Sequence, residues 1–156
     1  MSRRIITRLF AAVIALCTVQ IVCAQNISAD APTQLEVIDR VIGTGKTIAR
    51  GAFVVLQYSG YLFDPAAPDH KGYRFVSSRE RGESLSYKYG LKRAIPGFEK
   101  GLQGMKVGGS RTIVVPAQLG YDDLKYPRPQ DVPPKSALVF DVELIDVVPE
   151  SAPPDN

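Results

Sequence analysis

The chemically reactive side chains of this 156-residue chain are few. Its single histidine is His70, so a Ser–His–Asp or Cys–His arrangement would have to be built around it, and the chain has no Gly-x-Ser-x-Gly elbow. A lone histidine in a loop is usually a solvated surface residue. Zinc needs His, Cys or carboxylate ligands clustered at fixed spacing, and the sequence shows no such cluster. We therefore expect neither nucleophilic catalysis nor a metal site.

The glycine-containing segments do not predict nucleotide binding. Segment 43–47, Gly-Thr-Gly-Lys-Thr, resembles the end of a phosphate-binding loop, but the first glycine of that motif would fall at Arg40. A tight turn between two strands is the better interpretation. The later glycines suit a helix terminus and a turn; they are Gly101, Gly104, Gly108 and Gly109.

Aromatic side chains remain as the residues that could form a site. They are Tyr58, Phe75, Phe98, Tyr121 and Phe140. Most aromatic residues in strands pack into a core, and spacing alone favours that interpretation. A ligand pocket stays open as the alternative.

Short β-prone runs must position these aromatic residues. They cover 35–41, 53–58, 74–77, 85–89, 111–115 and 137–147. The last run alternates most clearly, with four apolar side chains on one face, Leu138, Phe140, Val142 and Leu144. Between Tyr61 and Arg74, two prolines and a glycine among polar residues predict a long loop.

One short helix is predicted after the fourth run. Pro96 suits the first helical position, because its missing N–H would have no partner there. The apolar residues around it recur at helical spacing and are Ile95, Phe98, Leu102 and Met105. The helix should close near Gly104. Antiparallel strands with one late helix predict a single α+β domain, in which a curved sheet packs its apolar face on that helix.

The N-terminus has the pattern of a secretory signal peptide. Three arginines, Arg3, Arg4 and Arg8, precede an uncharged run of 14 residues, 9–22, and the small residue Ala24 follows. A membrane-spanning helix needs about 20 apolar residues, so a permanent anchor is the weaker interpretation. Cys23 raises a lipoprotein alternative, but such a cysteine normally follows a small residue, whereas Val22 precedes it here.

We expect a signal peptide at 1–24, a flexible linker at 25–34, one domain at 35–148 and a disordered tail at 149–156. Both cysteines lie in the signal peptide, so the mature chain would form no disulfide. Cleavage removes three of the 19 basic residues and none of the 16 acidic ones, which leaves 16 of each. A neutral chain without basic runs excludes nucleic acid and an anionic membrane surface as partners.

Several blocks resemble, in order, the FKBP-type peptidyl-prolyl isomerases, and the resemblance covers about Leu35 to Val147. The blocks are Val55–Gly60, Phe75–Arg81, Ala94–Leu102, Met105–Gly109, Val115–Tyr121, Val132–Pro134 and Leu138–Leu144. The resemblance implies an antiparallel half-barrel of five or six strands wrapped around one short α-helix. It also implies isomerisation of X–Pro bonds in partly folded polypeptides, without a cofactor.

The same resemblance assigns roles to individual residues. Phe98 would form the floor of a pocket, Tyr58 and Phe140 would hold the proline ring, and the Tyr121 hydroxyl would bind a substrate carbonyl. Phe75 would complete the catalytic set. The neighbouring substrate-binding positions would be Val76, Arg81, Leu85, Ala94, Ile95 and Val132.

This sequence departs from the family pattern close to the pocket. Val76 stands where relatives carry aspartate, and Leu85 stands where phenylalanine is common. Asp122 replaces a usual glycine, and Asp131 precedes Val132 in place of a more apolar pair. We expect weak binding of rapamycin-like macrolides. Without the aspartate, we expect Arg81 to turn to solvent or to another acid and the pocket rim to be more mobile.

Two alternatives stay open beside an exported isomerase. The same pocket could serve a peptide-binding or chaperone module with negligible turnover, and an unrelated β-rich binding module would explain the strands but not the ordered blocks. The signal peptide predicts a periplasmic or secreted protein. The periplasm is favoured because the chain ends Pro-Pro-Asp-Asn and not in a retention signal. We expect a monomer.

Overall fold

The computed structural model describes residues 31–122 and 126–149. Their strands are β1 Glu36–Val41, β2 Phe53–Phe63, β3 Lys71–Ser77, β4 Leu85–Lys88, β5 Ser110–Val115 and β6 Leu138–Val148. The helices are α1 Ser78–Arg81 and α2 Pro96–Gly101, with 3₁₀ turns η1 Pro68–His70 and η2 Ala117–Leu119. All strand pairs are antiparallel, in the order β1-β5-β6-β2-β3, and β4 also pairs with β2. The predicted α+β fold with a six-stranded antiparallel sheet is confirmed.

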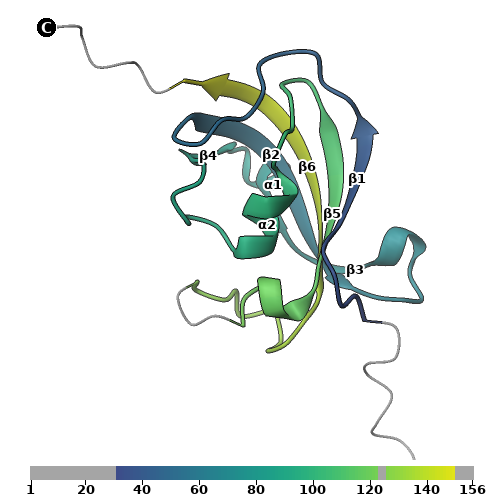
Figure 1. The fold of residues 1–156 in the computed structure, drawn as a ribbon. Helices are drawn as coiled ribbons and strands as arrows, with labels where there is room; N and C mark the ends of the chain where they lie inside the picture. Colours follow the sequence, from purple (N-terminus) through teal and green to yellow (C-terminus); the bar gives the residue numbers. More distant parts are fainter. Residues whose placement is uncertain (1–30, 123–125, 150–156) are drawn as a thin grey trace, which may run out of the picture.

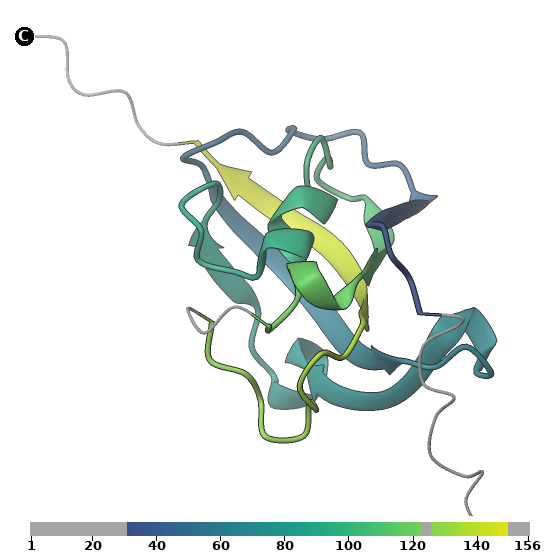
Figure 2. The same ribbon diagram turned by 60° about the horizontal axis from the view of Figure 1, so that its bottom comes forward.

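The sheet curves around α2, which lies against its concave side (Figure 1). A view turned by 60° shows α2 and η2 over the same side of the sheet (Figure 2). Alternate residues of the long strands point to this side, so the four apolar residues predicted for β6 are all buried. The core therefore fills the space between the sheet and α2.

A close approach to β5 fixes where α2 lies. Pro96 begins the helix, as predicted, but the helix ends at Gly101, one turn earlier than expected. Gly97 faces β5 so closely that a Cβ atom there would lie 2.3 Å from Cγ1 of Val115. A residue without a side chain lets the helix approach the strand, and this contact sets the height of Phe98 above the sheet.

A second helix, α1, corrects the prediction of only one. It is a single turn after β3, and its N-cap is Ser77, whose hydroxyl accepts a hydrogen bond from the Glu80 N–H at 3.4 Å. Ser77 and Glu80 have the spacing of a capping box, which is a local signal that could have predicted this turn.

The prediction of a long loop from Tyr61 to Arg74 is wrong. β2 continues to Phe63 and β3 already begins at Lys71, so the two strands form a hairpin with a connection of only residues 64–70. Both prolines of the segment fall in that connection, where no ladder hydrogen bond is needed. His70 lies there too and stacks on Phe63, with ring centroids 5.0 Å apart.

The expected signal peptide, most of the expected linker and most of the expected tail lie outside the described residues. Of the linker, the Thr33 carbonyl accepts a hydrogen bond from Gln118 Nε2 at 2.8 Å. Within residues 31–122 and 126–149, no helix is long and apolar enough to cross a membrane.

Candidate active site

An apolar pocket of about 220 Å³ opens between α2, the sheet and the loops beside them. Ten residues line it: Tyr58, Leu85, Arg93, Ala94, Ile95, Phe98, Tyr121, Tyr126, Pro127 and Phe140. They come from β2, β4, β6, α2 and the connections around these elements. Only one of the ten carries a charge.

Edge-to-face aromatic pairs build the floor and one wall. The Phe98 ring lies 5.1 Å from Phe140 and 5.9 Å from Tyr58, at interplanar angles of 76° and 70°. Phe75 continues the series, 6.0 Å from Phe140 and 6.5 Å from Tyr121. Such pairs are each worth about 0.5–1.5 kcal/mol beyond their buried area, so the rings hold one another in place.

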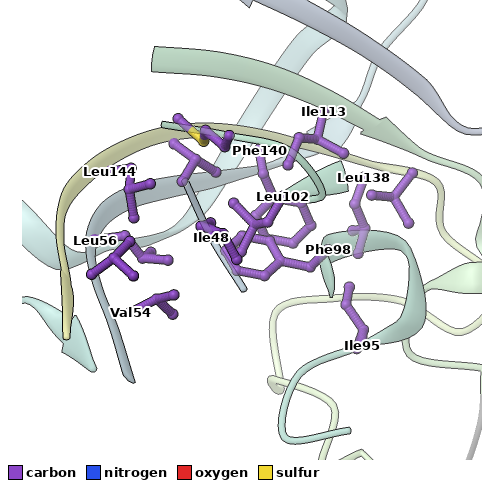
Figure 3. Packing of buried hydrophobic residues seen from close by; sticks show 14 of the residues in the cluster. Ile48, Val54, Leu56, Ile95, Phe98, Leu102, Ile113, Leu138, Phe140 and Leu144 are labelled. Atoms are coloured by element: carbon purple, nitrogen blue, oxygen red, sulfur yellow. The ribbon is translucent and has the colours of Figure 1, made fainter. Parts of the chain in front are cut away.

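The floor of the pocket is also part of the core. Phe98 is 3% exposed and Phe140 is 2% exposed, and both pack in the main hydrophobic cluster (Figure 3). The sequence left a core role and a pocket role open as alternatives, but for these two rings the two roles coincide. Each ring packs in the core and also presents part of its surface to the pocket.

Gly60 on β2 explains how Phe75 reaches the pocket rings. A Cβ atom on Gly60 would lie within 2.8–2.9 Å of Phe75 Cζ, Val76 Cγ1 and Phe140 Cε1. The missing side chain thus leaves the space into which these three side chains pack. Val76 pairs with Gly60 across the β2–β3 ladder and does not line the pocket.

The two tyrosine hydroxyls near the floor differ in their surroundings. Burial and, to a smaller degree, the neighbouring Tyr58 raise the pKa of Tyr121 to about 12. Its hydroxyl therefore stays protonated at neutral pH and can donate a hydrogen bond. The Tyr58 hydroxyl instead accepts a hydrogen bond from Arg81 Nη2 at 2.8 Å, and the guanidinium lies 6.0 Å from the Tyr58 ring centroid.

The contact with Tyr58 completes the expectation for Arg81. We expected this arginine to turn to solvent or to another acid; it does turn to solvent, and it also donates to the Tyr58 hydroxyl on the pocket wall, which was not expected. Arg81 itself is exposed and is not a lining residue. It needs no buried carboxylate, because water solvates the rest of its guanidinium.

The eleven predicted site residues fall into three sets. Seven line the pocket: Tyr58, Leu85, Ala94, Ile95, Phe98, Tyr121 and Phe140. Phe75 contacts two of their rings, while Val76, Arg81 and Val132 lie outside the lining. Val132 is 1% exposed, and its carbonyl accepts a hydrogen bond from Arg128 Nη1 at 2.6 Å, so it supports the loop before β6.

Sequence reasoning missed three lining residues, Arg93, Tyr126 and Pro127. Arg93 directly precedes the Ala94–Leu102 block, so its position beside that block was an available signal. Tyr126 and Pro127 fall between blocks, in a loop whose path depends on tertiary packing. Nothing in their local pattern indicates that they close the pocket.

A second hollow, of about 300 Å³, is polar and lies mainly over positions that alternate with the buried ones, such as Asp141 and Glu143. Its cations are matched by acids. Arg40 pairs with Asp69, Lys71 pairs with Asp69 and Asp141, and Arg79 pairs with Glu143. Because the facing charges satisfy one another, this hollow is the weaker candidate for a site.

The apolar pocket contains no reactive nucleophile and no histidine. In the part of the chain that the structure describes, no three His, Cys, Asp or Glu side chains gather in a way that could hold a metal ion. The pocket can therefore enclose an apolar ring and donate hydrogen bonds. A curved antiparallel sheet wrapped on a helix, with such a pocket at its open side, defines a protein of the FKBP class.

Comparison with known proteins agrees with this class. The sequence profile described as FKBP-type peptidyl-prolyl cis-trans isomerase matches residues 44–145, and the chain belongs to this family. It is 40% identical over 107 residues to the FKBP-type peptidyl-prolyl cis-trans isomerase FkpA of Escherichia coli K12, which covers 69% of this chain and 35% of FkpA. It is 32% identical over 105 residues to the FK506-binding protein of Neisseria meningitidis serogroup B, which covers 67% of this chain and 88% of that protein.

Solved structures give the same result. The crystal structure of FkpA from Escherichia coli matches 75% of this chain and 49% of that chain, with a TM-score of 0.62 and 38% identity. The crystal structure of AtFKBP13 matches 74% of this chain and 94% of that chain, with a TM-score of 0.58 and 29% identity. The chain spans about a third of the length of FkpA and about a fifth of FK506-binding protein 4 of Neurospora crassa.

Proposed function

We propose that this protein is a peptidyl-prolyl cis-trans isomerase that rotates X–Pro bonds in exported polypeptides and so assists their folding. The observation that carries the proposal is the apolar pocket floored by Phe98 and Phe140, with the protonated hydroxyl of Tyr121 among its lining groups. Membership of the family supports the same reaction.

The reaction suits a site without reactive groups. Rotation of an X–Pro bond meets a barrier of about 20 kcal/mol and takes tens of seconds or more unaided, yet it makes and breaks no covalent bond. The twisted amide has lost its resonance and part of its dipole. An apolar pocket that excludes water therefore favours the twisted state over the planar ground state.

Five of the ten lining residues then have a role in the reaction. Phe98 supports the proline ring from below, and Tyr58 and Phe140 hold its two faces. Tyr121 donates a hydrogen bond to a substrate carbonyl, which orients the amide while it turns. The apolar side chain of Ile95 helps to keep water from the bond.

The substrates we propose are proline-containing segments of unfolded or partly folded polypeptides. The lining is apolar for a proline ring, and the exposed Arg81 and Arg93 beside it can contact the residues that flank the proline in a polypeptide. Rapamycin-type macrolides would bind weakly, because Val76 offers no carboxylate and Arg81 is engaged with Tyr58. No cofactor is needed.

We also propose export, which rests on the sequence of residues 1–24. Cleavage between Ala24 and Gln25 would release a periplasmic or secreted domain. The intact mass of the exported protein should correspond to a chain that begins at Gln25. A lipid mass on Cys23, or retention of residues 1–24, would overturn this part of the proposal.

Exchange spectroscopy on an X–Pro peptide, with the mature chain, tests the proposed reaction. Tyr121→Phe removes one hydrogen bond, worth about 0.5–1.5 kcal/mol, and should lower kcat/KM by about 2- to 10-fold. Tyr73→Phe is the matched control, because Tyr73 is 60% exposed and lies outside the pocket. Peptide binding without any catalysed exchange would favour the peptide-binding or chaperone alternative.

A further inference from the structure

The charge of the apolar pocket comes from a single side chain. Among its ten lining residues, Arg93 is the only one of the charged residue types Asp, Glu, Lys and Arg. The other nine are aromatic, aliphatic or proline. A substrate whose proline enters this pocket therefore meets one positively charged side chain in the pocket wall.

Contacts hold the backbone of Arg93 while leaving its side chain available. Glu99 Oε1 accepts hydrogen bonds from the Arg93 N–H at 2.9 Å and from the Ala94 N–H at 3.4 Å. The Glu99 carboxylate is thus directed to amide groups and does not pair with the guanidinium. Among the residues that the structure describes, no acid or carbonyl accepts a hydrogen bond from the Arg93 side chain.

Three other exposed arginines differ from Arg93 in this respect. Arg40, Arg74 and Arg79 each form an ion pair with an acid, to Asp69, Glu80 and Glu143 respectively. Arg81, the other arginine beside the pocket, already donates to the Tyr58 hydroxyl. Its charge has the same sign as that of Arg93, so two arginines lie beside the pocket, and the Glu99 carboxylate at this rim accepts from backbone amides.

We propose that Arg93 is a specificity-determining residue that selects substrates with an Asp or Glu next to the proline. This inference rests on the proposed function, because it names the substrate class of the same pocket. When the proline ring lies over Phe98, the flanking residues of the substrate lie at the rim, within reach of a long arginine side chain. A carboxylate there forms a charge-assisted and often bidentate hydrogen bond with the guanidinium.

The test compares peptides that differ at one position. In Ala-X-Pro-Phe peptides with X as Glu, Gln or Lys, the Glu and Gln peptides have nearly the same shape, so their ratio isolates the charge. Exposed ion pairs of this kind change an equilibrium or a rate by about two- to fivefold. We expect kcat/KM for the Glu peptide to exceed that for the Gln peptide by this factor at low salt.

Variants at Arg93 should move this ratio in a fixed order. Arg93→Gln should bring the Glu-to-Gln ratio to about one, and Arg93→Glu should make the Lys peptide the preferred one. Arg93→Lys should keep a ratio above one, because it keeps the charge. Lys92→Gln is the matched control: it removes an adjacent exposed charge that does not line the pocket, and it should leave the ratio unchanged.

Peptide affinity, measured by NMR titration, separates this inference from the proposed function. No catalysed exchange of any peptide, together with tighter binding of the Glu peptide that Arg93→Gln abolishes, would overturn the isomerase proposal and support the charge selection. Normal exchange with a Glu-to-Gln ratio of one or below would overturn the role of Arg93 alone. A ratio that falls equally in Arg93→Gln and Lys92→Gln would also overturn it, because the preference would then be a general effect of net charge.

Discussion

Substitution of Phe98 by leucine distinguishes the role of this ring in turnover from its role in stability. Phe98→Leu keeps an apolar side chain at a position that is 3% exposed, so no polar group is buried. It removes two edge-to-face ring contacts, with Phe140 at 5.1 Å and with Tyr58 at 5.9 Å. At about 0.5–1.5 kcal/mol for each contact, the free energy of unfolding should fall by about 1–3 kcal/mol.

The expected loss leaves the variant folded. Small domains have free energies of unfolding of about 5 kcal/mol or more, so at least about 2 kcal/mol should remain and roughly 97% of the molecules stay folded. A fall in turnover beyond a few per cent cannot then be an effect of unfolding. If the Phe98 ring supports the proline in the twisted state, losing that ring contact should lower kcat/KM by about 2- to 10-fold.

The assay measures exchange of an X–Pro peptide and urea unfolding on the same samples. Ile113→Val is the control, because Ile113 is fully buried in the same cluster, lies outside the pocket and should lose about 0.5–1.5 kcal/mol on this substitution. We expect its turnover per folded molecule to match that of the unsubstituted protein. Full turnover per folded Phe98→Leu molecule, or an equal loss in Ile113→Val, would refute the pocket role of Phe98.

Three further predictions concern the hydroxyl, the rim and the helix. The pKa of Tyr121 is raised from 10 to about 12, so the unfolded chain loses this proton at a lower pH than the folded chain. The contribution of Tyr121 to the free energy of unfolding should therefore be fully present below pH 10 and should fall as the pH rises towards 12. Urea unfolding at pH 8–11 should show a shallower fall for Tyr121→Phe than for the unsubstituted protein. Val76→Asp should supply Arg81 with a charge-assisted hydrogen bond worth about 1.5–3 kcal/mol before the cost of desolvating the new carboxylate. Calorimetry should then show tighter binding of a rapamycin-type macrolide, while turnover should change less. Unchanged macrolide affinity would contradict this prediction. Gly97→Ala should lower the free energy of unfolding by about 1–3 kcal/mol, because the added Cβ would overlap Val115, and this cost should exceed the gain from the higher helix propensity of alanine. Thermal unfolding measures the change. A stabilised variant would show that α2 can move away from β5.

The strands could be predicted because their sequences carry local information. Alternation over 137–147 matches β6 because one face of that strand is buried in the core, whereas the other, apart from the buried Val139, is half-buried or exposed. The error at Tyr61–Arg74 has a tertiary cause. β2 continues past Tyr61 because it pairs with β6 on one side, through Tyr61↔Val139 and Leu62↔Leu138, and with β3 on the other. Breaker residues nearby gave no indication of those partners.

The site could be predicted only in part, because its lining combines residues from blocks and from loops. The rings of Phe98 and Phe140 fall in recognisable blocks, so the resemblance indicated them. Tyr126 reaches the pocket only through the fold of the loop before β6, which no periodic pattern describes. The partner of Arg81 was also missed, because removing an aspartate from the pattern does not indicate which neighbouring hydroxyl replaces it.

Because the floor of the pocket is made of core residues, its geometry is set by folding itself. Phe98 and Phe140 are held by the same contacts that stabilise the domain, so no separate ordering step is needed when a proline enters. The rim is different, since Arg81 and Arg93 are exposed and Val76 lies outside the lining. Substitutions at the floor must therefore change stability and turnover together, whereas substitutions at the rim can change which sequences are bound while the reaction and the fold persist.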